Sequence, residues 1–202
     1  MSTMKITTKI AVAIIASLTS FCAFAQNQWY ITAGYLNSDN KASAAIGGTT
    51  LTTNNGGFYV GAGYEAPVNQ IDNFYLEGQF LYSYLGDKNG DVTESIHMLN
   101  IPFRAKYKVY ITDQFGVFGY GGPVASFGLA ANDKVGNISY SLYGDDGIIN
   151  RVDLKLGIGG GIELSHRISF RVGYDWGLFN MSKIGDAKMH INWFHVGVAY
   201  NL

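Results

Sequence analysis

Twelve charged or titratable side chains lie on the polar face of segments in which apolar and polar residues alternate with period two. They are Glu65, Glu77, Arg104, Lys106, Lys108, Arg151, Asp153, Lys155, Glu163, Arg171, Asp175 and His195. Leaving His195 aside, the set comprises six permanent cations and five carboxylates. Because a buried charge is heavily penalised unless it is paired, such a set inside a protein predicts interlocking salt bridges.

Enzymatic chemistry would require a nucleophile or activated water, a histidine base and an orienting carboxylate within hydrogen-bond reach. The four histidines are His97, His166, His190 and His195. His97 follows Glu94 and Ser95 closely, but none of the four stands in a recognisable catalytic motif. We therefore predict no catalytic residue, and we expect His195 to be a hydrogen-bonded member of the charged set.

The clearest alternation, which indicates the elements that carry these charges, runs from Arg151 to Leu164, and the segment from Ile168 to Leu178 repeats it. In both, one face is apolar and the other consists of charged residues, glycine and serine. Apolar side chains toward lipid with charged and small ones toward a lumen are typical of a transmembrane β-barrel. The charged set is thus expected to line the lumen.

Eight such segments are expected, at 28–36, 57–66, 73–85, 96–110, 115–130, 150–165, 168–178 and 189–202. Long polar connections cover 37–56, 86–95, 131–149 and 179–188, and short ones cover 67–72, 111–114 and 166–167. We predict an all-β fold: an eight-stranded antiparallel transmembrane up-and-down β-barrel with four long outer loops and three short periplasmic turns. Glycines and Pro123 in 115–130 predict a bulge or kink there.

Aromatic residues test this register, because they are enriched at both membrane interfaces. Those expected to face lipid near the periplasmic rim are Trp29, Tyr64, Phe74, Tyr107, Phe170 and Tyr200. Those expected near the outer rim are Tyr35, Phe58, Tyr84, Trp176 and Phe194. The last strand also alternates up to Leu202, as does the C-terminal signal that the barrel-insertion machinery reads.

No cofactor or metal site is predicted. No two histidines lie near carboxylates at a typical ligand spacing. Gly144–Gly147 contains two aspartates that could hold calcium, but the regular spacing of a calcium loop is missing, so an exposed turn is expected. The glycines of Gly157–Gly161 lie in a strand with charged flanks and are interpreted as room for neighbouring side chains in the lumen.

Residues 1–25 differ in composition from the rest, with two lysines ahead of an apolar stretch, Ile10–Leu18, and a small-residue pattern, Ala23–Ala25. This predicts a cleaved signal peptide followed by a barrel domain at 26–202. Cleavage would remove two lysines and no acid, so the formal charge would change from −1 to −3, and the only cysteine would be lost. The absence of a Lys and Arg cluster outside the strands argues against nucleic acid as a partner.

The stretch Leu99–Tyr107, with its Leu-x-Ile-Pro pattern, resembles the outer membrane β-barrel domain family abundant in Bacteroidetes, often called PorT-like. Gly119–Pro123, Gly157–Glu163 and Tyr174–Asn180 are similar to the second half of that family, which also groups small barrels such as OmpX and OmpA. The resemblance implies a barrel in the bacterial outer membrane. It has no shared catalytic motif and adds no site residue.

Three hypotheses about function follow. The leading one is a non-enzymatic outer-membrane protein with a lumen plugged by side chains, whose loops serve adhesion, interaction or envelope integrity. Eight strands enclose a bore that side chains just fill, whereas porins use about 16 to 18 strands. The alternatives are a narrow channel or carrier for small solutes and, third, a lipid-modifying enzyme. Expected partners are outer-membrane lipids, the barrel-insertion machinery and an extracellular ligand bound through the loops.

Overall fold

The computed structural model describes the chain in eight stretches: residues 28–43, 50–68, 70–89, 92–135, 138–143, 147, 149–183 and 187–202. The predicted signal peptide lies outside them, as do parts of the connections at the loop tips. Within the described residues no helix is both long and apolar enough to cross a membrane.

Nine antiparallel strands form one sheet. They are β1 (Gln28–Ser43), β2 (Thr50–Pro67), β3 (Phe74–Asn89), β4 (Val92–Thr112), β5 (Phe115–Val135), β6 (Ile138–Ser141), β7 (Val152–Leu164), β8 (Ile168–Gly177) and β9 (Lys188–Asn201). Eight of them close into a ring in the order β4-β3-β2-β1-β9-β8-β7-β5, with β5 pairing back to β4. The predicted eight-stranded antiparallel barrel is confirmed, and the short β6 is an addition that pairs with β5.

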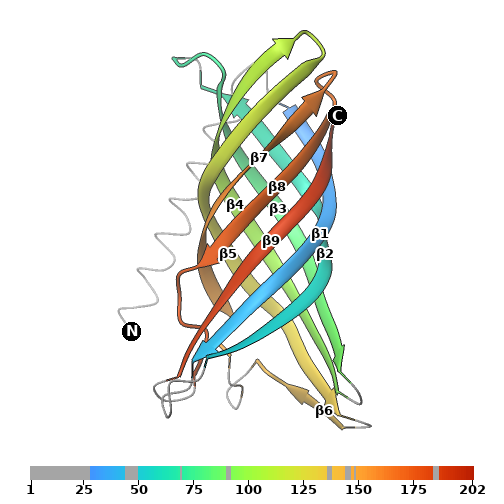
Figure 1. Cartoon of the computed structure of the whole chain (residues 1–202), viewed down its shortest axis with the longest axis vertical. Helices are drawn as coiled ribbons and strands as arrows, with labels where there is room; N and C mark the ends of the chain where they lie inside the picture. Colours follow the sequence, from blue (N-terminus) through green and yellow to red (C-terminus); the bar gives the residue numbers. More distant parts are fainter. Residues whose placement is uncertain are drawn as a thin grey trace, which may run out of the picture.

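Figure 1 shows the strands tilted around a tall barrel, with the three short turns and the C-terminus at one end. We call this the turn end, and the opposite end, where β6 lies, the loop end. The turns span 68–73, 113–114 and 165–167, close to the positions expected from the sequence. Closure matters because every backbone group in a lipid-embedded sheet must find a partner within the protein, and a ring has no open edge.

The strands extend further at the loop end than the sequence analysis expected. The segment 37–56, predicted as a loop, is mostly a β-hairpin in which Asn37–Ser43 pairs with Thr50–Gly56. The segment 86–95 is likewise mostly paired, from Gly86↔Ser95 to Asn89↔Val92. Polar residues hide this pairing, because a segment composed mainly of polar residues shows no hydrophobic alternation.

The alternation predicted from the sequence separates the two faces of the wall. The outward face exposes the large apolar side chains of the two expected aromatic bands, among them Trp29, Tyr107, Phe170, Tyr35, Phe58, Trp176 and Phe194. Val196, Val198, Tyr200 and Leu202 of the last strand are exposed too. The expected irregularity in β5 is also confirmed: the register with β4 shifts between His97 and Met98, which leaves Leu129 without a partner position.

Candidate functional site

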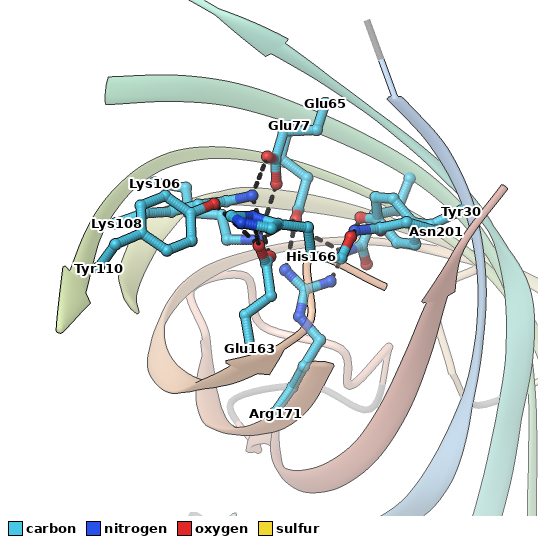
Figure 2. A network of polar contacts seen from close by, with 11 residues as sticks. Tyr30, Glu65, Glu77, Lys106, Lys108, Tyr110, Glu163, His166, Arg171 and Asn201 are labelled. Atoms are coloured by element: carbon cyan, nitrogen blue, oxygen red, sulfur yellow. Dashed lines mark hydrogen bonds and ion pairs between the residues drawn. The ribbon is translucent and has the colours of Figure 1, made fainter. Parts of the chain in front are cut away.

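The lumen at the turn end holds a chain of alternating charges from five strands (Figure 2). In order, its members are Glu163, Lys108, Glu65, Lys106, Glu77 and Arg171, each in ion-pair contact with the next. The Lys106 Nζ lies 2.7 Å from Glu65 Oε2, and the Lys108 Nζ lies 3.0 Å from Glu163 Oε2. All six side chains are buried, so this end of the lumen is closed by paired charges.

Neutral polar groups extend this chain at both ends. Tyr110 donates its hydroxyl to Glu163 Oε1 at 2.9 Å. At the other end Gln79 Nε2 donates to Glu77 Oε1 at 2.6 Å and to the Tyr30 hydroxyl at 2.7 Å. These hydrogen bonds are accepted by carboxylate lone pairs that the cations do not occupy. A buried carboxylate needs such additional hydrogen bonds in order to stay ionised.

Two further ion pairs lie beyond this chain, toward the loop end. Arg104 Nη2 is 3.1 Å from Asp175 Oδ1, and His195 Nε2 is 3.6 Å from Asp175 Oδ2. Lys155 contacts Asp153 and also donates to the carbonyl of Ile191 at 2.8 Å. The Arg104–Asp175 pair joins β4 to β8 across the lumen, whereas Asp153 and Lys155 both belong to β7.

Each buried cation of the lumen also lies against an aromatic ring. The Lys106 Nζ is 4.2 Å from the ring centre of Phe118, and the Lys155 Nζ is 4.5 Å from that of Trp193. Arg104 and Arg171 lie 4.6 Å and 5.1 Å from the ring of Tyr120. A desolvated cation over a ring gains about 2 kcal/mol, so the rings offset part of the cost of burial.

One residue of the predicted set lies elsewhere, and its placement in the lumen is corrected here. Arg151 precedes β7 and is exposed, with its guanidinium 5.5 Å from the ring centre of Tyr143. The strand begins only at Val152, so the alternation rule does not apply to Arg151. The other eleven side chains are buried, and without Arg151 the lumen holds five permanent cations and five carboxylates.

An apolar cluster, which the sequence analysis missed, fills the loop end of the lumen. Its members from the strands include Leu36, Leu85, Ile96, Met98 and Ile191. Tyr143, Ile149 and Met181 join it from the connections after β6 and β8. The signal was present in the sequence: apolar residues stand among polar ones in the predicted loops, but nothing local shows that they fold inward.

Between the charges and the apolar cluster the lumen retains a small cavity of about 20 Å³. Its lining includes Asn100, Arg104, Asp175, Trp193 and His195. A space of this size holds little more than one water molecule, because a water needs roughly 10–15 Å³ measured in this way. At this height the described side chains therefore leave little free space in the lumen.

The remaining histidines do not form a catalytic constellation. His97 faces outward, and its Nδ1 is 2.6 Å from the hydroxyl of Tyr82. His166 is exposed at the turn after β7, 3.7 Å from Glu163. His190 Nδ1 lies 3.2 Å from the carbonyl of Gly177. In the stretches that the structure describes, no three histidine, cysteine or acidic side chains are grouped to hold a metal ion.

A row of acids crosses the wall at the loop end. The strand registers place Asp87 opposite Glu94, and Glu94 opposite Asp133. Burial and the neighbouring charges of Asp133 and Asp87 raise the pKa of Glu94, and burial raises the pKa of Asp133. The folded protein thus holds these protons more tightly than the unfolded chain does.

These features define a small integral outer-membrane β-barrel with a filled lumen. The family model for the outer membrane protein β-barrel domain matches residues 10–201, and the chain belongs to that family. The protein is located in the bacterial outer membrane, where such barrels place short turns in the periplasm and longer loops outside. The narrower PorT-like assignment stays a prediction.

A comparison with solved structures finds similarity to small outer-membrane barrels. PagL, an outer membrane enzyme, is 12% identical over 83% of this chain and 99% of its own, with a TM-score of 0.50. Ail of Yersinia pestis, solved with the heparin analogue sucrose octasulfate, is 17% identical over 88% and 100%, with a TM-score of 0.48. OprG of Pseudomonas aeruginosa is 12% identical over 87% and 96%, with a TM-score of 0.47. No curated protein matches the sequence.

The first prediction concerns the Glu77–Arg171 pair. Arg171→Met leaves the buried Glu77 carboxylate with Lys106, 3.7 Å away, as its remaining ion-pair partner, and we expect a loss of about 3–5 kcal/mol in the free energy of unfolding. In the double variant Glu77→Gln/Arg171→Met, the loss is smaller than the sum of the two single losses. Urea unfolding in detergent micelles measures all three, and Arg151→Met is the exposed control. Additive losses would show that the two residues do not interact.

The second prediction concerns the acid row. Glu94→Gln removes like-charge repulsion, so we expect it to stabilise the barrel at pH 7 by about 0.5 kcal/mol. Because the folded pKa of Glu94 is raised, the wild-type carboxyl stabilises the fold only below its unfolded pKa, and this stability is lost as the pH rises through the folded pKa. The gain should therefore shrink in unfolding curves recorded from pH 7 down to pH 4. A gain that does not depend on pH would contradict this reading.

Proposed function

We propose that this protein is a non-enzymatic, non-conducting outer-membrane barrel that displays its outer hairpins for contact, adhesion or envelope integrity. The observation that carries the proposal is that charged and apolar side chains together fill the lumen. A chain of paired charges occupies the periplasmic half, and an apolar cluster that encloses the Lys155–Asp153 pair occupies the outer half. Together they favour a rigid scaffold over a transport route.

The alternative role as a narrow channel would require this filling to move. An ion that crossed the lumen would have to separate buried pairs such as Lys106–Glu65 and Arg104–Asp175, and each separated charge would lose its compensation in a low dielectric. It would also have to pass Met181 and Tyr143, which are buried at the outer end. Both barriers argue for the closed state as the working state.

The alternative role as a lipid-modifying enzyme has less support. PagL is an enzyme with this fold, so the fold alone permits catalysis. His97 is the outward-facing histidine nearest to the outer aromatic band, where lipid chemistry would occur. Its Nδ1 contacts the Tyr82 hydroxyl, and in the described part of the chain no carboxylate orients it. The arrangement lacks the third group that makes a histidine an effective base.

Surface contact is favoured by the architecture of the outer end. The hairpins β1–β2 and β3–β4 continue beyond the outer aromatic band as paired strands, and β6 extends the wall beside β5. Because paired strands fix both ends of the connections at 44–49 and 136–137, these short segments lose less conformational freedom on binding than longer loops would. We propose an extracellular ligand for this end, outer-membrane lipids for the apolar band, and recognition of the alternating last strand by the barrel-insertion machinery.

The third prediction is that the protein conducts no ions across a lipid bilayer. Refolded protein in a planar lipid bilayer should produce no discrete current steps across voltages and salts, and Arg104→Ala should remain silent because the rest of the lumen stays filled. Heat-modifiable gel migration confirms folding, and a trimeric porin added to the same bilayer confirms that steps can be detected. Reproducible steps that change in Arg104→Ala would replace this proposal with the channel.

The fourth prediction tests whether the outer connections are needed for surface contact while the strands alone maintain the stability of the barrel. Replacing 44–49 and 136–137 by short Gly-Ser linkers keeps the paired strands and should leave the unfolding curve within about 0.5 kcal/mol of wild type. Attachment to surfaces and detergent resistance of cells carrying this variant should fall to the level of cells without the protein. A matched replacement of the periplasmic turn residues 113–114 should leave both unchanged. Wild-type behaviour of the outer variant would remove the main support for a display role.

A further inference from the structure

The row of acids at the loop end lies on the inner face of the barrel wall. Ile96 and Ala131 are buried members of the apolar cluster and face each other across β4 and β5. Glu94 and Asp133 lie two residues further toward the loop end on the same strands, and residues two apart share a face. Asp87, opposite Glu94, continues the row on β3. These carboxylates therefore stand at the outer mouth of the lumen, directly above the apolar cluster.

Glu94 and Asp133 have no cation to balance them in the part of the chain that the structure describes. Every ion pair there involves other carboxylates. Lys134 follows Asp133 in the chain, but strand alternation turns it to the opposite face of the wall, where it is exposed. Like charges directly opposite each other destabilise a sheet. The protein thus leaves negative charge uncompensated at the mouth.

Asn55, on β2, places a buried side chain in this row. The residue is fully buried, and its side-chain amide contacts the Glu94 carboxylate although β3 lies between the two strands. Among the described groups, Oδ1 of Asn55 has no hydrogen-bond partner, and neither has the buried Oδ1 of Asp133. Buried polar atoms without a partner are rare in folded proteins. Both atoms are acceptors beside a further carboxylate, so a cation satisfies them best.

The chemistry of these ligands favours calcium. Ca²⁺ takes about six to eight oxygen ligands in flexible geometry, from carboxylates, amide carbonyls and water, whereas Mg²⁺ demands a near-ideal octahedron and gives up its water reluctantly. Glu94 and Asp133 are directly opposite on adjacent strands, where Cβ atoms are about 4.5–5.5 Å apart, so both carboxylates can reach one ion. Both side chains are only partly buried, which lets the ion enter from outside and keep water molecules.

We propose that Glu94, Asp133 and the Oδ1 atom of Asn55 bind one Ca²⁺ ion at the outer mouth of the lumen. The two carboxylates neutralise the ion, the amide oxygen is the third protein ligand, and water completes the shell. The described acidic side chains do not form a metal site by themselves, so the site depends on Asn55. Asp87 has an interaction of its own and contributes negative charge, not a ligand.

This inference goes beyond the display role, because the ion joins β2, β4 and β5 whether or not the outer hairpins bind a partner. Neither conductance nor attachment of cells enters its test. Its failure and the failure of the proposed function are therefore separate results.

Calorimetry tests the ligands directly. Chelator-treated, refolded protein in zwitterionic detergent is titrated with CaCl₂ and, separately, with MgCl₂. We expect one Ca²⁺ per barrel with a Kd of about 10⁻⁴–10⁻³ M and at least about tenfold weaker binding of Mg²⁺. Glu94→Gln and Asn55→Leu should each weaken Ca²⁺ binding at least about tenfold, whereas Asp72→Asn, an exposed acid at the turn end, should not. Equal affinity in wild type and both row variants would overturn the site.

Urea unfolding provides a second readout that does not depend on the heat of binding. In EDTA, Glu94→Gln should unfold at a higher urea concentration than wild type, because only repulsion is removed. At ten times the Kd, Ca²⁺ shifts the folding equilibrium of wild type about elevenfold, which exceeds the roughly twofold effect of that repulsion. The order of the two proteins should therefore reverse in CaCl₂, and Asp72→Asn should respond as wild type does. A calcium response that is absent from wild type, or equal in Glu94→Gln, would overturn the proposal.

Discussion

The balance of charge inside the barrel is the constraint on which the rest of the structure depends. Five cations and five carboxylates occupy a space that eight strands make too narrow for bulk water. Any of them left unpaired would cost several kcal/mol, so the ring can close only in a register that brings partners together. Glu77 and Arg171, from β3 and β8, illustrate how a contact across the lumen ties distant strands.

Two kinds of side chain, charged and apolar, fill the two halves of the lumen. Ion pairs supported by aromatic rings occupy the periplasmic half, where strands supply every member of the network. Apolar side chains occupy the outer half, where Tyr143 and Met181 come from connections rather than strands. Apolar packing tolerates the irregular backbone of a connection better than ion pairs do, because it does not depend on the direction of each contact. The described side chains thereby fill much of the lumen in both halves.

The backbone pairing of the barrel wall is less regular than the packing of side chains in the lumen. Continuous pairing through β7, β8 and β9 contrasts with two interruptions, at Pro102 in β4 and at Pro123 in β5. A protein that needed only a rigid scaffold would gain from a hydrogen bond at each of these positions. This irregular part of the wall lies next to the small lumen cavity, which Gln79, Arg104 and Val124 line.

The sequence by itself determined the strands, their faces and the charges that point inward, because a period of two is a local property of the chain. It placed Lys106 and Glu163 in the lumen but misplaced Arg151, which lies just before its strand begins. Only the tertiary structure decided which charges pair, since Glu77 and Arg171 are 94 residues apart. It also decided that polar hairpins continue as strands and that Met181 folds inward, because both depend on a partner that local sequence does not specify.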